Sequence, residues 1–152
     1  VNRLGTPAKV NADDRLTDYG LTIVYEMQRL GIAVDVTRTG DTSGEIDGQR
    51  MQVSLGKGPT VKIKDSSVQC NPQVMELLRK AAKAAKIPYQ DEILLAGGTD
   101  TAAVQKTRAG ILSGCVSIPC RNIHSPGDIV NLKDVENVGK LLAAVAQTEI
   151  EL

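Results

Sequence analysis

The stretch that decides the fold is residues 71–100, NPQVMELLRKAAKAAKIPYQDEILLAGGTD. It opens with Asn71-Pro72, a preferred helix cap followed by the residue that favours the first helical position. Apolar residues then recur every three or four positions, which predicts an amphipathic helix that ends before Pro88. Its expected buried face comprises Val74, Leu77, Leu78, Ala81 and Ala85. The apolar run at 92–96 predicts a buried strand leading into a Gly-Gly turn.

The segments that follow continue the alternation of helix and strand. We expect a helix over 101–108, a strand over 110–119, a loop over 121–131 and a helix over 133–146. The pattern of the last helix turns Val135, Val138, Leu142 and Val145 inward. Such alternation predicts an α/β fold with three αβα layers and a central mixed, mostly parallel sheet.

The segments that precede the stretch add further expected elements. Alternating residues predict strands over 51–55 and 60–64, after a polar loop over 39–50. An apolar stripe predicts a helix from about Asp14 to Leu30, and a β-branched run predicts a strand from Ile32 to Thr37. Only Gly31 separates these two elements, although such connections usually have about two to six residues.

Composition narrows the class of protein. The 152 residues fit one domain over 1–152, and 18 basic side chains balance 18 acidic ones. This balance argues against a nucleic-acid partner and against an anionic membrane, and the absence of Trp and Phe argues against base stacking. No apolar run approaches the roughly 20 residues that span a bilayer. Three irregularly spaced cysteines favour a cytoplasmic, reducing location.

Three acidic residues could act as metal ligands. Asp13 and Asp14 precede a predicted helix, where they could bridge metal ions or could simply cap the helix N-terminus. Asp35 lies in an apolar strand, where a carboxylate is costly unless it is paired or binds a metal. The alternative for Asp35 is a strand-end residue that caps a loop.

His124 and one turn complete the candidate site. His124 is the only histidine and lies in a loop after a predicted strand, as either a metal ligand or a solvated side chain. The turn Gly97-Gly98-Thr99-Asp100 joins a strand to a helix. It could present backbone N–H groups to an anion, or it could be a tight turn capped by Thr99 or Asp100.

Five motifs occur in a characteristic order along the chain. They are KVNADDR at 9–15, IAVDVT at 32–37, GKGP at 56–59, AGGTD at 96–100 and IPCRNIHSP at 118–126. Together they resemble the dinuclear-metal aminopeptidases, which include glutamyl and deblocking aminopeptidases, the tetrahedral (TET) particles and relatives labelled endoglucanase or cellulase. Each motif alone is weak, but the ordered set spans nearly the whole chain.

The resemblance implies a peptide hydrolase with two divalent metal ions, zinc or cobalt. By this resemblance Asp13 bridges both metals, Asp35 and His124 are terminal ligands, and Asp14 supports Asp13. Gly97, Gly98 and Asp100 are expected to line the pocket for the peptide substrate, a weaker assignment. The resemblance also implies a homo-oligomer, either a dimer or a dodecamer.

The chain departs from the family pattern in two places. The family's first His ligand lies in an N-terminal segment that this sequence does not contain. The family's Glu-Glu pair, a general base and a ligand, belongs between the first helix and the Asp35 strand, where only Gly31 stands. The chain is therefore expected to be a partial catalytic domain with a segment missing between Leu30 and Ile32. A metal-dependent aminopeptidase and a non-catalytic remnant or assembly module of the same fold both remain open.

Overall fold

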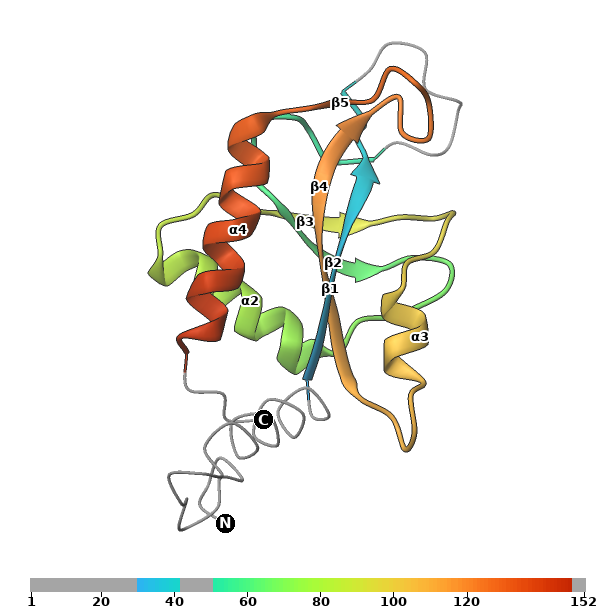
Figure 1. The fold of residues 1–152 in the computed structure, drawn as a ribbon, viewed down its shortest axis with the longest axis vertical. Helices are drawn as coiled ribbons and strands as arrows, with labels where there is room; N and C mark the ends of the chain where they lie inside the picture. The colour runs from blue at the N-terminus through green and yellow to red at the C-terminus, as the bar shows by residue number, and fades with distance from the viewer. Residues whose placement is uncertain (1–29, 42–50, 149–152) are drawn as a thin grey trace, which may run out of the picture.

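The computed structural model describes residues 30–41 and 51–148. Within these ranges the chain forms five strands and three helices (Figure 1). In chain order they are β1 (Leu30–Arg38), β2 (Thr60–Lys64), α2 (Pro72–Ala84), β3 (Gln90–Ile93), α3 (Thr101–Gln105), β4 (Leu112–Arg121), β5 (Ile129–Val130) and α4 (Leu132–Ala146). None of the described helices is both long and apolar enough to cross a membrane.

The strands form one mixed sheet in the order β1-β4-β2-β3, with β5 added to β4. The longest ladder is parallel and joins β1 to β4, from the pair Leu30 and Leu112 to the pair Arg38 and Cys120. β2 and β3 are also parallel, whereas β4 is antiparallel to both β2 and β5. The predicted mixed, mostly parallel sheet is confirmed.

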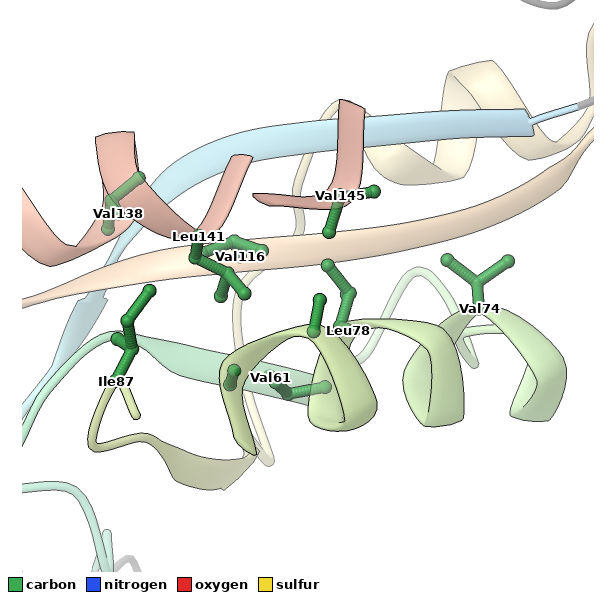
Figure 2. Close-up of a cluster of buried hydrophobic side chains, with 10 residues drawn as sticks. Val61, Val74, Leu78, Ile87, Val116, Val138, Leu141 and Val145 are labelled. Carbon is green, nitrogen blue, oxygen red and sulfur yellow. The ribbon is translucent and has the colours of Figure 1, made fainter. Parts of the chain in front are cut away.

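Helices α2 and α4 cover one face of the sheet and bury the main hydrophobic core. Figure 2 shows Leu141 and Val145 of α4 pointing toward Leu78 of α2, with Val116 of β4 beside Leu141. Leu78, Val116 and Leu141 are completely buried, and each such side chain stabilises the fold by about 1.5–3 kcal/mol. Asn71 caps α2 as predicted, since its Oδ1 accepts a hydrogen bond of 2.8 Å from the Gln73 N–H.

Helix α3 covers the opposite face, which completes the three expected layers (Figure 1). Gly31 of β1 makes this contact possible, because a Cβ at Gly31 would lie 2.4 Å from Cγ1 of Val104. Gly114 plays the same part on the core face, where its Cβ would lie 2.6 Å from Cγ1 of Val74. The two glycines therefore let helices approach the sheet from both sides.

The residues that the two long helices bury differ slightly from the predicted buried faces. In α4 the buried apolar residues are Val138, Leu141 and Val145, whereas Val135 is 38% exposed. In α2, Ala82 is buried and the predicted Ala85 is an exposed cap residue. The apolar stripe is broader than the contact, so packing against the sheet selects which apolar residues lie inside.

Several predicted boundaries were wrong. Residues 51–55 form no strand, although Met51 and Val53 are buried and the Gly40 N–H bonds to the Val53 carbonyl at 2.8 Å. The strand expected over 92–96 is β3 at 90–93, and the helix expected over 101–108 ends at residue 105. β4 runs two residues beyond its predicted end, and β5 lies inside the predicted loop.

The predicted one-residue connection at Gly31, between a helix ending at Leu30 and a strand beginning at Ile32, is not present. Leu30 and Gly31 already belong to β1, so a helix cannot extend to Leu30. The predicted helix from Asp14 otherwise lies outside the described residues.

Candidate active site

A cavity of about 230 Å³ opens at the carboxyl end of β1. Segments far apart in sequence line it: Arg38 at the end of β1, Met51, residues 93–97 at and after the end of β3, and residues 123–124 in the loop after β4. The lining residues are Arg38, Met51, Ile93, Leu94, Leu95, Ala96, Gly97, Ile123 and His124. Ligand sites in open α/β sheets occur outside the carboxyl ends of strands, where the strand order reverses.

Asp35 lies on β1, level with Ser117 of β4 and three residues before the strand ends. Its side chain is half-buried, and Oδ1 accepts a hydrogen bond of 2.7 Å from the Val36 N–H. No described residue bonds to Oδ2. Asp35 is therefore not a strand-end cap for a loop, and it keeps one carboxylate oxygen for another partner.

His124 lies in the loop after β4 and lines the cavity with an exposed side chain. The loop is sharply bent, since Asn122 and His124 have φ angles of 56° and 64°, and Asn tolerates this left-handed region well. The Ser125 N–H donates to Asp128 at 3.1 Å, and the Asn122 amide donates to the Gly127 carbonyl at 3.3 Å. These bonds hold His124 at the mouth of the cavity.

An ion pair fixes this loop to the end of β1. Arg121 donates two hydrogen bonds to Asp41, from Nε to Oδ1 at 3.0 Å and from Nη2 to Oδ2 at 2.7 Å. The hydrogen bonds from Arg121 lower the pKa of Asp41 well below its ordinary value, although partial burial opposes this shift. The Leu55 N–H also donates to Asp41, so the same carboxylate ties in the segment after Val53.

The turn at 97–100 supplies less of the cavity than expected. Gly97 lines it, whereas Gly98 and Asp100 are absent from the lining. The Thr99 hydroxyl donates to Asp65 at 3.2 Å, and Asp100 stands at the start of α3 without a capping hydrogen bond from its side chain. Neither residue therefore caps α3 through its side chain, and the turn is fixed by the 65–67 segment instead.

The described residues contain two of the predicted metal ligands, Asp35 and His124. Asp35 lies opposite Ser117 within the parallel β1–β4 ladder and is absent from the cavity lining, whereas His124 follows the end of β4 and lines the cavity. A carboxylate and an imidazole are donor types that suit zinc and cobalt. No group of three His, Cys, Asp or Glu side chains that could hold a metal occurs within 30–41 and 51–148. Asp13 and Asp14 lie outside the described residues, so a third ligand is not tested.

A buried charged cluster beneath the site was missed from the sequence. Lys62 of β2 forms an ion pair with Glu92 of β3, and both side chains are 0% exposed. Glu92 also accepts hydrogen bonds from the hydroxyls of Thr37 at 2.8 Å and Thr60 at 2.5 Å. The alternation of Thr60–Lys64 predicts a strand, but it does not indicate that the face carrying Lys62 is buried.

Comparisons with known proteins place the chain among aminopeptidases. Residues 20–141 match the family described as M42 glutamyl aminopeptidase. The chain is 49% identical over 113 residues to a candidate aminopeptidase of Acetivibrio thermocellus, and 33% identical over 119 residues to the lysyl aminopeptidase of Pyrococcus furiosus. These alignments cover 74% and 78% of this chain but 33% of each relative, so the chain spans about a third of their length.

Solved structures give the same result. An aminopeptidase from the archaeon Desulfurococcus kamchatkensis superposes with a TM-score of 0.72 at 31% identity, over 91% of this chain and 39% of that one. A TET aminopeptidase from a marine-sediment Thaumarchaeota archaeon superposes with a TM-score of 0.73 at 30% identity, over 91% and 38%.

Proposed function

Because the chain belongs to the M42 glutamyl aminopeptidase family, we propose that the protein is a metal-dependent aminopeptidase that releases N-terminal residues from peptides. The observation that supports the proposal is an apolar cavity lined by His124, in the loop that follows β4, the strand paired with the Asp35 strand β1. A hydrolase of this kind needs metal-binding donors next to a pocket for the substrate side chain.

Each candidate residue has a definite part in the proposal. Asp13, Asp35 and His124 would hold two divalent metal ions, zinc or cobalt, with Asp13 shared between the two ions and Asp14 supporting Asp13. When bound, the metals would lower the pKa of water and polarise the first peptide carbonyl. The Asp41–Arg121 pair keeps the His124 loop against the end of β1.

The lining of the cavity indicates the substrate side chain. Six of its nine described lining residues are Met, Ile, Leu or Ala, and none of the nine is acidic. An uncharged N-terminal side chain of the size of Leu or Met fits this lining, whereas the described lining offers no carboxylate to the ammonium group of a lysyl side chain. We therefore expect leucyl substrates to be preferred over lysyl substrates, and Gly97 leaves room beside the side chain.

The same proposal includes assembly and location. One structural relative, the TET1 peptidase of Pyrococcus horikoshii, can assemble into a tetrahedron or a large octahedral shell. A homo-oligomer of this chain, a dimer or a dodecamer, is the corresponding proposal. The three cysteines are free and buried, which suits a reducing cytosol.

The second candidate is a non-catalytic module with the family's core. The 152-residue sequence contains no Glu-Glu pair, which the resemblance assigns to the general base and one ligand. Loss of a general base typically costs about 10²–10⁴-fold in rate. This observation favours a module that assembles without hydrolysing peptides.

Hydrolysis of leucine p-nitroanilide by the full chain decides between the two functions. The metal-dependent aminopeptidase predicts release of the chromophore with cobalt or zinc, its loss with EDTA, and its loss in Asp35→Asn and His124→Ala. Lys133→Ala, an exposed residue on α4, is the matched control that should keep full activity. No release from a folded, metal-loaded chain would refute the enzyme and support the module, whereas metal-independent release would refute both proposals.

A further inference from the structure

Asp35 shares one face of the sheet with the buried charged cluster. The ladders place Asp35, Ser117, Thr60 and Gln90 opposite one another in a single row across β1, β4, β2 and β3. Residues directly opposite in a ladder point to the same face, and so do residues two apart along a strand. Thr37, Lys62 and Glu92 therefore face the same side as Asp35, the side that α3 covers.

The cluster holds Glu92 in one position. Lys62 donates to Oε1 of Glu92, Thr37 donates to the same oxygen at 2.8 Å, and Thr60 donates to Oε2 at 2.5 Å. All four side chains belong to residues with 0% exposure. Hydrogen bonds to an ionised group are roughly twice as strong as those between neutral groups. Glu92 is therefore a rigid acceptor for the Thr37 hydroxyl.

The bond to Thr37 matters because β1 has only one strand neighbour among the described strands. In the order β1-β4-β2-β3, β1 pairs with β4 alone. The hydrogen bond from Thr37 to Glu92 reaches past β4 and β2 to β3 and attaches β1 to a second strand of the sheet.

We infer that Glu92 is a positioning residue for the proposed metal site. Glu92 acts through Thr37 and fixes the half of β1 that presents Asp35. This inference rests on the proposed function, because Asp35 needs a fixed carboxylate only if it binds a metal. Asp35 lies two residues before Thr37 on the same face, so rotation or fraying of β1 at Thr37 would displace Oδ2 of Asp35, which accepts no hydrogen bond from a described residue. Ligands that lack a fixed orientation bind metals less well.

Cobalt binding by the full chain tests the inference. Affinity is measured by titration calorimetry, and the ligand field is followed by the visible absorption of bound cobalt. Thr37→Val keeps the shape of the side chain and removes the hydroxyl, and we expect it to weaken cobalt binding by about 10-fold or more. Thr37→Ser restores the hydroxyl and should restore both the affinity and the absorption spectrum.

Thr101→Val is the matched control. Thr101 is equally buried, and its hydroxyl donates no hydrogen bond to Glu92. Its substitution should leave cobalt binding unchanged. Thr37→Ala removes the same hydroxyl with less steric demand and replaces Thr37→Val if that variant does not fold.

The outcomes separate the inference from the proposed function. No cobalt binding by the wild-type chain would refute the proposed function and the inference with it. Wild-type binding that is unaffected by loss of the Thr37 hydroxyl would refute the inference alone. An equal loss in Thr37→Val and Thr37→Ser would also overturn it, because the hydroxyl would then not be the cause.

Discussion

Removal of the Lys62 charge should destabilise the fold far more than its position on a five-residue strand suggests. Lys62→Met keeps the length of the side chain and leaves Glu92 buried with only the hydroxyls of Thr37 and Thr60 as partners. Breaking a fully buried ion pair by removing one partner costs about 3–5 kcal/mol, because the remaining charge is uncompensated. The Nζ atom of Lys62 also lies 3.6 Å from Oδ2 of Asp65, so Asp65 would lose this positive charge as well.

Urea unfolding measures this cost. With a slope of about 2 kcal/mol/M, the loss corresponds to a fall of about 2 M in the unfolding midpoint. Lys64→Met is the matched control, since Lys64 lies exposed on the same strand and should change stability by less than about 0.5 kcal/mol. The double variant Lys62→Met/Glu92→Gln should be more stable than Lys62→Met alone, because it leaves no unpaired buried charge: the amide oxygen accepts from one threonine hydroxyl and the amide NH2 donates to the other.

The pH dependence follows from the same pair. Burial alone would lower the pKa of Lys62, but attraction to Glu92 and the hydrogen bond with it outweigh burial and raise that pKa above its ordinary value of 10.5. A raised lysine pKa contributes stability that is fully present below the unfolded pKa and is lost as pH rises through the folded pKa. The difference between wild type and Lys62→Met should therefore persist from pH 7 to pH 10. Equal midpoints for the two proteins at pH 7 would refute the reasoning.

Three further variants or treatments test the fold around the site. Leu141→Ala should destabilise the protein by about 2–5 kcal/mol in the same unfolding assay, and an effect no larger than that of the half-exposed Val135→Ala would contradict the core assignment. Gly58→Ala should cost at least about 2 kcal/mol, because Gly58 has φ of 94° and a Cβ would lie 2.0 Å from the Pro88 carbonyl oxygen; wild-type stability would show that the turn is built differently. Burial raises the pKa of Cys70 to about 12, so this thiol should react with Ellman's reagent at pH 8 only after unfolding, and a fast reaction of the folded protein would exclude its buried position.

The sequence predicted the elements that local chemistry controls. Asn71-Pro72 fixes the start of α2, and the apolar spacing that follows fixes its length, so both could be predicted without tertiary information. The segment at 51–55 alternates like a strand but pairs through a single backbone bond and the side chain of Gln90, which a sequence pattern cannot reveal. β5 has two residues and exists only because β4 lies beside it.

The candidate site was predicted through its motifs rather than its geometry. Asp35 and His124 were singled out from the sequence; the structure describes Asp35 within β1 and His124 in the loop after the neighbouring strand β4, at the cavity. Lys62 and Glu92 were not singled out, because a charged residue in an alternating strand usually faces water. The side chains that surround Glu92 come from β1 and β2, which are far from it in sequence, so the burial of this pair is a tertiary property.

Anomalous scattering at the zinc edge from crystals of the full chain, grown with zinc, tests the central claim most directly. The account predicts a metal peak bound by the carboxylate of Asp35 or the imidazole of His124, beside the apolar cavity, and the loss of that peak in the doubly substituted Asp35→Asn/His124→Ala protein. A well-ordered site with no peak at either residue, or zinc bound only elsewhere, would contradict it.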